Sequence, residues 1–273
     1  MSPVFLVLDI HVLALFQRFF MVNGHRLIKN IVFFVEPSFF IYLCILTNQA
    51  SQVKAHDMTR KERYTYIIDY FKEHQPEVTT QLEFGSAFQL LCATLLSAQC
   101  TDKRVNEITP ALFHQYPTAK LMSTAEPEDV LEYVHSVSYP NSKARHLVEM
   151  ARMIVTDFNG EVPDNTADLV KLPGVGRKTA NVLQAVWFGK AVMAVDTHVY
   201  RVAHRLGLVP ATANTPLKVE EALERNIPKE DIPRAHHWLL LHGRYVCQSA
   251  RPKCDKCPFD GICPKLLKGS KLE

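Results

Sequence analysis

Three groups of residues in this sequence have the types and spacing that chemistry requires. Lys178 follows the string Leu-Pro-Gly-Val-Gly-Arg, at the expected start of a helix. Asp196 follows the apolar run 191–195 and precedes another helical segment. Four of the seven cysteines crowd into the last part of the chain, at Cys247, Cys254, Cys257 and Cys263. An amine and a carboxylate suit covalent and acid–base catalysis, and clustered thiols suit a metal centre.

Lys178 has the position of an activated amine. An ammonium at the positive end of a helix, partly removed from water beside Thr179, Ala180 and Asn181, is destabilised relative to the neutral amine. A neutral amine can attack a sugar carbon and form a Schiff base. The alternative is a solvated lysine that only contacts phosphate.

The residues before Lys178 predict a turn that binds an anion. We name residues 172–176 the glycine hairpin; its members are Leu172, Pro173, Gly174, Val175 and Gly176. Both glycines permit backbone angles closed to other residues and carry no side chain that would hold a ligand off the backbone. Free amides and the dipole of the helix that starts at Arg177 favour a phosphate there. A plain helix–turn–helix connection is the alternative.

Asp196 is expected to cap a helix. Aspartate before the run Val199-Tyr200-Arg201-Val202 is a good N-cap, which would explain the residue on structural grounds alone. Capping and catalysis are compatible, since a capping carboxylate at the mouth of a cleft can also stabilise a cationic sugar or relay protons.

The cysteine spacing, C-x6-C-x2-C-x5-C, places four thiolates within reach of one centre. Zinc and an iron–sulfur cluster both accept four cysteines, so the spacing alone leaves both open. Crowding of this kind does not fit a secreted disulfide scaffold and indicates a reducing, intracellular setting. Arg251 and Lys253 are expected to contact phosphate, or to form a solvated basic loop. The isolated Cys92 and Cys100 are expected to fill a core.

The elements that would position these residues are helices. From residue 58 onward apolar residues recur at helical spacing, as at Tyr64, Ile67, Ile68 and Phe71. Residues 87–98 are apolar nearly all round, as in a buried helix, and 178–188 form another periodic run. Sustained period-two alternation is absent, and proline and glycine punctuate at short intervals. The pattern predicts an all-α fold.

Residues 1–57 read differently from the rest. Their two apolar stretches, 4–20 and 31–46, are interrupted by polar residues or proline and are too short for a membrane span. Three interpretations remain: a translated stretch upstream of the true start, a membrane-associating tail, or an extra packed segment. We favour the first, because Met58 precedes Thr59-Arg60-Lys61-Glu62, a natural start for a solvated helix.

Bulk composition sets wide bounds. A chain of 273 residues with 47% hydrophobic residues can bury one large core or two moderate ones. A net charge of only +3 permits a nucleic-acid partner without requiring one.

Taken together, the motifs resemble endonuclease III. The resemblance lies in residues 96–99, 172–181, 195–199 and 241–244, with the terminal cysteines completing the order, and it covers about residues 58–268. The hairpin string is similar to the helix-hairpin-helix of DNA-repair proteins. The 6-2-5 cysteine spacing resembles the [4Fe–4S] site of the family.

The resemblance implies a two-lobed helical protein with a DNA cleft between the lobes. One lobe would be a six-helix domain, residues 80–190, that contains the helix-hairpin-helix. The other would join residues 58–79 to 191–273 and carry the [4Fe–4S] cluster.

The resemblance also implies a bifunctional DNA N-glycosylase and abasic-site (AP) lyase of base excision repair. Lys178 matches the lysine that displaces an oxidised pyrimidine, and the imine then permits β-elimination of the 3′ phosphate. Asp196 matches the catalytic aspartate. Gln99 matches a residue that fills the gap left by the extruded nucleotide. Tyr139 stands where many relatives have an apolar wedge, so stacking in DNA and packing on its own loop both remain open.

The expected partner is double-stranded DNA with an oxidised pyrimidine or an abasic site. We expect a monomer in the cytoplasm, associated with the nucleoid and without a stable membrane partner. Beyond the catalytic pair, the expected DNA contacts are Gln99, Tyr139, Leu172, Pro173, Gly174, Val175, Gly176, Arg177, Arg251 and Lys253.

Two rival functions deserve comparison. An adenine-mismatch glycosylase shares the hairpin, the aspartate and the cluster, but it lacks the nucleophilic lysine and usually has a further C-terminal domain. Here Lys178 is present and only ten residues follow Cys263. The second rival is a DNA-binding module without catalysis, in which Lys178 only contacts phosphate.

Overall fold

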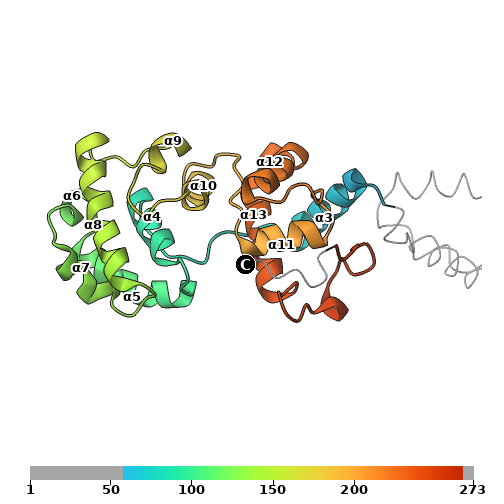
Figure 1. The fold of residues 1–273 in the computed structure, drawn as a ribbon, viewed down its shortest axis with the longest axis horizontal. Coiled ribbons are helices and arrows are strands. Elements are labelled where there is room, and N and C mark those ends of the chain that lie inside the picture. Colours follow the sequence, from blue (N-terminus) through green and yellow to red (C-terminus); the bar gives the residue numbers. More distant parts are fainter. Residues whose placement is uncertain (1–57, 267–273) are drawn as a thin grey trace, which may run out of the picture. The chain divides into compact units, whose positions relative to one another are not determined.

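The computed structural model describes residues 58–266, and within them the fold is built from helices joined by short loops (Figure 1). The α-helices are α3 (Arg60–His74), α4 (Ala87–Leu96), α5 (Asp102–Gln115), α6 (Ala119–Met122), α7 (Pro127–Val134), α8 (Pro140–Asp157), α9 (Thr166–Leu169), α10 (Arg177–Val186), α11 (Thr197–Arg205), α12 (Pro216–Asn226) and α13 (Ile232–Tyr245). Two 3₁₀ turns, η1 (Lys229–Asp231) and η2 (Cys254–Lys256), complete this part of the chain. No described residue lies in a strand, so the all-α prediction is confirmed there.

Short polar side chains start most of these helices. A side-chain oxygen at the N-cap accepts a hydrogen bond from the backbone N–H three residues on, which satisfies one of the free amides of the first turn. This occurs at Thr59, Ser86, Thr101, Thr118, Asn165, Asp196 and Thr215. At Thr59 the backbone N–H also donates a hydrogen bond to the side chain of Glu62. This capping box confirms the helix start predicted after Met58.

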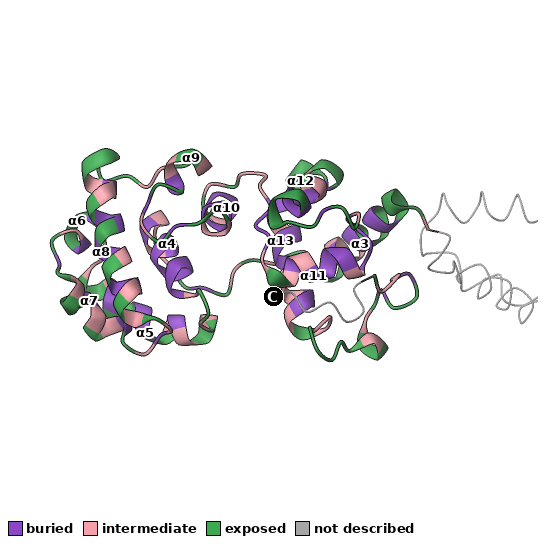
Figure 2. Ribbon diagram, viewed as in Figure 1, coloured by how far each residue is buried: buried purple, intermediate pink, exposed green. Residues whose placement is uncertain are grey.

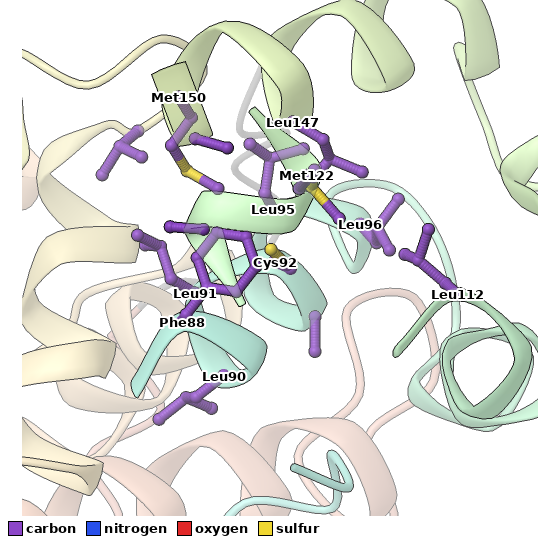
Figure 3. Close-up of a cluster of buried hydrophobic side chains, with 14 of the residues drawn as sticks. Phe88, Leu90, Leu91, Cys92, Leu95, Leu96, Leu112, Met122, Leu147 and Met150 are labelled. Carbon is purple, nitrogen blue, oxygen red and sulfur yellow. The ribbon is translucent and has the colours of Figure 1, made fainter. Parts of the chain in front are cut away.

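One buried cluster surrounds α4. Eight of its ten residues are buried, because its apolar side chains face outward in almost every direction. Figure 3 shows Leu91, Cys92 and Leu95 among side chains such as Met122 and Met150. Helices α5, α7, α8 and α10 add further members, including Leu112, Val130, Leu147 and Leu183. The prediction of a buried helix is confirmed, although α4 ends at Leu96 and leaves 97–98 in a turn.

A second buried cluster joins α3 to the later helices α11, α12 and α13. The rings of Phe71 on α3 and Trp238 on α13 stack with centroids 5.6 Å apart. Phe259, beyond η2, packs its ring edge against Phe71 at 5.2 Å. In Figure 2 these helices carry buried residues, in purple, beside exposed ones, in green. The chain thus brings a segment near residue 70 against one near residue 259.

None of the helices within residues 58–266 combines the length and the apolar character that a membrane crossing needs. The expectations for residues 1–57 lie outside the described residues.

Candidate active site

A pocket of about 480 Å³ brings together three of the residues singled out in the sequence: Gln99, Lys178 and Asp196. Lys178 comes from α10 and Asp196 from the start of α11. Gln99 comes from the turn between α4 and α5. Side chains of α13 complete the wall. A lysine, a carboxylate and an amide far apart in the sequence therefore open onto one cavity.

Lys178 is the second residue of α10, and its side chain is partly buried. Among the described residues, none forms a hydrogen bond or ion pair with its ammonium, whereas the guanidinium of neighbouring Arg177 is paired with Glu220. The amine is thus placed to face whatever enters the pocket.

Asp196 is held by its own helix. Its Oδ1 accepts a hydrogen bond of 2.8 Å from the Val199 N–H, so the predicted N-cap is confirmed. Within residues 58–266, the other carboxylate oxygen has no hydrogen-bond partner, and Asp196 forms no ion pair with Lys178. One oxygen is therefore fixed, while the other remains available to the pocket that both residues line.

The two glycines of the glycine hairpin differ in conformation. Gly174 has φ +76°, and a Cβ there would lie 2.8 Å from Leu95 Cδ1 and 3.0 Å from His146 Cβ. Gly176, by contrast, has φ −90° and ψ 173°, which is an extended N-cap open to any residue, and a Cβ there would meet nothing within 4 Å. Gly174 therefore uses the backbone freedom of glycine, whereas Gly176 provides only the absence of a side chain.

The remaining hairpin residues lie outside the pocket wall. Leu172 and Val175 are buried in the cluster around α4, so they anchor the glycine hairpin to that core. Pro173 lies in the turn that follows α9, which ends at Leu169. The guanidinium of Arg177 donates to both carboxylate oxygens of Glu220, at 2.6 to 3.1 Å. That pair raises the pKa of Arg177 and ties α10 to α12.

Gln99 and Tyr139 share an unusual backbone geometry. Both are exposed and both have left-handed conformations, with φ +54° and +55°. The Ser138 hydroxyl donates to the Gln99 carbonyl at 2.5 Å, so the two loops are neighbours. Tyr139 is 66% exposed at the start of α8, which argues against packing on its own loop.

Two histidines of the pocket were not predicted from the sequence. His236 and His237 on α13 are buried, and their Nδ1 atoms lie 2.7 and 3.2 Å from the carbonyls of Ala194 and Pro233. Burial, then His237 and Lys178, lowers the pKa of His236 well below its usual range. Burial and Lys178 likewise lower the pKa of His237. With Nδ1–H donated to a carbonyl, each neutral ring presents Nε2 as an acceptor.

An ion pair of the pocket wall was also missed. Arg244 Nη1 donates to Asp102 Oδ2 at 2.7 Å and to Gln81 Oε1 at 3.1 Å. The i, i+4 spacing of 236, 240 and 244 on α13 is the signal that could have found this face, because such residues share one side of a helix. Cys92 is buried as predicted, and Cys100 is half-buried, packs against the same buried cluster and also lines the pocket.

The four terminal cysteines occupy one neighbourhood, away from the pocket. Burial and then the charges of the other thiols raise the pKa of Cys257 to about 11, and the pKa of Cys263 is raised as well. Arg205 lies beside them, with Nη1 3.6 Å from Cys247 Sγ. Within the described part of the chain, no three His, Cys, Asp or Glu side chains are arranged to hold a single metal ion.

The chemistry of the donor set is that which a [4Fe–4S] cluster would take: four thiols in one neighbourhood, whose thiolate forms a bound metal would stabilise. In a [4Fe–4S] cluster each cysteine binds a different iron, so its ligands stand further apart than those of zinc. Arg251 and Lys253 are exposed in the loop between Cys247 and Cys254.

Comparison with known proteins gives consistent matches. The model of the HhH-GPD superfamily base excision DNA repair protein matches residues 92–229. Endonuclease III of Escherichia coli strain K12 is 41% identical over 203 residues, which cover 74% of this chain and 95% of the relative. Endonuclease III of Rickettsia felis is 42% identical over 197 residues, 72% of this chain and 92% of the relative.

The structural comparison gives the same family. A trapped endonuclease III–DNA covalent intermediate matches with a TM-score of 0.72 and 39% identity, covering 76% of this chain and 97% of that one. A non-covalent endonuclease III–DNA complex has the same TM-score and 38% identity. The chain therefore belongs to the endonuclease III family of the HhH-GPD superfamily, a class of bifunctional DNA glycosylase and AP lyase in base excision repair.

Proposed function

We propose that this enzyme removes oxidised pyrimidines from duplex DNA through a Schiff base on Lys178 and then cleaves the strand 3′ to the abasic site by β-elimination. The observation that carries the proposal is the Lys178 amine, free of partners among the described residues, on a pocket that Asp196 shares. A lysine on the wall of a cavity of about 480 Å³ supports the role of a nucleophile over that of a lysine that only contacts phosphate.

The chemistry proceeds in two stages. The neutral Nζ of Lys178 attacks C1′, the C1′–N bond to the damaged base breaks, and the base leaves with the bonding pair and takes up a proton. The nitrogen loses a proton, and the C1′–O4′ bond then breaks while O4′ takes up a proton, which gives the imine. Removal of a C2′ proton then expels the 3′ phosphate, because the imine withdraws electrons from that carbon.

Asp196 supports the first stage. As C1′ loses the base, the sugar gains cationic character, and a fixed carboxylate stabilises it. The oxygen of Asp196 that caps α11 sets the orientation of the group, and the free oxygen faces the pocket. The same oxygen can accept the proton that the attacking amine releases.

Access to C1′ requires the damaged nucleotide to leave the duplex. Gln99, exposed beside the pocket, would fill the gap, and the exposed ring of Tyr139 would stack as a wedge. The helix-hairpin-helix and the loop with Arg251 and Lys253 would hold phosphates on either side, so affinity should fall as salt rises.

A [4Fe–4S] cluster on Cys247, Cys254, Cys257 and Cys263 would fix the basic loop in place. Its contribution is structural, since these thiols lie outside the pocket. The division into a helix-hairpin-helix domain, residues 80–190, and a cluster domain of 58–79 and 191–273 stays a prediction, which the two separate buried clusters support. We also expect the enzyme to act as a monomer.

The test compares the wild-type enzyme with Lys178→Gln on duplexes that contain an oxidised pyrimidine or an abasic site. Base release and strand cleavage are measured separately, by assaying strands with and without alkali treatment. We expect the wild type to release the base and cut the strand, and Lys178→Gln to bind abasic duplex yet do neither. Strand cleavage by the variant would show another nucleophile, and a wild type inactive on every lesion would favour the non-catalytic module.

A further inference from the structure

Lys143 is a buried lysine that the proposed chemistry does not use. It lies in the first turn of α8 and is only 6% exposed. Its Nζ donates to the carbonyls of Leu96 at 2.8 Å and Ala98 at 2.6 Å. A buried ammonium is costly unless it is paired, so these contacts must be important to the local structure.

The two carbonyls belong to the end of α4 and the turn after it. The last carbonyls of a helix lack partners within the helix, and a cation there also complements the negative end of the dipole. Gln99 follows Ala98 directly, in the left-handed conformation with φ +54°. A residue other than glycine keeps that conformation only where its surroundings impose it.

The same first turn of α8 positions Tyr139. Its backbone carbonyl accepts a hydrogen bond of 3.1 Å from the Lys143 N–H, and its own φ is +55°. Next to it, Ser138 Oγ donates to the Gln99 carbonyl. Three side-chain hydrogen bonds, two from Lys143 and one from Ser138, therefore join the Gln99 turn to the Tyr139 turn.

We propose that Lys143 is a positioning residue that locks Gln99 and Tyr139 into one rigid unit, so that the two side chains enter duplex DNA together and hold the nucleotide extruded. The proposal rests on the proposed function, because it assumes that both side chains enter the helix. Rigid presentation avoids the cost of ordering two loops during extrusion. Lys143 itself does not line the pocket and meets its wall only through the backbone carbonyl of Ala98.

The experiment compares two abasic substrates, one duplex and one single-stranded, because a single strand has no stack to leave. Lys143→Met removes both side-chain hydrogen bonds at similar length. The matched control is Arg152→Met, since Arg152 also lies on α8 and donates to two backbone carbonyls, those of Ser123 and Ala125. Those carbonyls are remote in sequence from the Gln99 turn.

We expect Lys143→Met to lower kcat/KM on the duplex by at least about tenfold while single-strand cleavage changes less than about twofold. Arg152→Met should affect both substrates alike. A 2-aminopurine opposite the lesion should brighten on binding to the wild type and brighten less with Lys143→Met. Equal losses on both substrates, or no loss on the duplex, would overturn the proposal.

If Lys143→Met does not fold, Ser138→Ala is used in its place. This change removes the third hydrogen bond between the two turns, that from Ser138 Oγ to the Gln99 carbonyl, and it lies in a loop near the surface. The same selective loss on duplex DNA, smaller in size, is expected. Undiminished duplex cleavage and fluorescence would then contradict the rigid unit. A wild-type enzyme inactive on both substrates would instead contradict the proposed function, so the two failures are distinguishable.

Discussion

At the scale of residues, Lys178 and Asp196 meet opposing demands. A carboxylate in contact with an ammonium stabilises the charged form, which cannot act as a nucleophile. In the described part of the structure, one oxygen of Asp196 accepts a hydrogen bond from the Val199 N–H, and Asp196 forms no ion pair with Lys178. The second carboxylate oxygen therefore remains free to act on the sugar.

Asp196→Asn separates the two roles of this residue. Asparagine caps helices about as well as aspartate, so the free energy of unfolding should change by less than about 1 kcal/mol. Base release should slow by roughly 10²- to 10⁴-fold, the usual contribution of a positioned acid–base group. Single-turnover kinetics and a urea titration give the two quantities. A large loss of stability with nearly normal kinetics would mean that Asp196 is only a cap.

At the scale of elements, the glycine hairpin offers a matched pair of variants. Gly174→Ala places a Cβ against Leu95 and His146 at a positive φ, so it should cost about 1–3 kcal/mol of stability. In Gly176→Ala the added Cβ meets no protein atom, and the backbone angles are open to any residue. The free energy of unfolding should therefore change by less than about 1 kcal/mol. Its added methyl should nonetheless keep a phosphate from the amides and weaken DNA binding.

Thermal melts and duplex affinities of both variants test this assignment. Equal melting temperatures for the two would contradict the conformational argument for Gly174. Unchanged affinity of Gly176→Ala for the duplex would mean that the hairpin amides do not contact phosphate.

Helix α13 makes stability depend on pH through its buried histidines. Burial, with the charges of His237 and Lys178, holds the pKa of His236 well below its usual range, while the unfolded chain takes up a proton near pH 6.5. Stability is therefore full above about pH 6.5 and falls on acidification, since the unfolded state then binds more protons. His237, and His242 with a pKa of about 4, add to the same trend.

His236→Asn keeps a donor for the Ala194 carbonyl but cannot titrate. The melting temperature of the wild type should fall between pH 7 and pH 5, and the variant should show a shallower fall from a lower starting value. His114→Asn on the exposed face of α5 is the control and should follow the wild type. Parallel slopes for all three proteins would show that His236 is protonated in the folded state.

Sequence patterns predict the helices of this fold better than they predict the residues that line the pocket. The cap at Thr59, the buried helix α4 and the cap at Asp196 follow from local residue types, which act within one turn. His236, His237 and Arg244 were missed because α13 brings them to the pocket only through tertiary packing against α10 and α11. The difference between Gly174 and Gly176 could not be predicted either, since glycine types alone do not distinguish a positive φ from close ligand approach.

At the scale of the whole described fold, two ion pairs connect the buried clusters around the pocket. Arg177 on α10 pairs with the buried Glu220 on α12, and Arg244 on α13 pairs with Asp102 on α5. In each pair one partner lies on a helix of the α4 cluster and the other on a helix of the second cluster. These pairs help to hold Lys178 in position relative to Asp196, because α10 contributes to the first cluster and α11 to the second. Neither pair was predicted, because charge patterning along the sequence carries no information on such distant partners.

The most direct measurement is borohydride reduction of the wild-type enzyme with an abasic duplex, followed by mass spectrometry of the cross-linked peptide. Reduction converts a Schiff base into a stable secondary amine and so marks the nucleophile. We predict one covalent adduct, attached to Nζ of Lys178. The absence of an adduct from active enzyme, or its attachment to another amine, would contradict it.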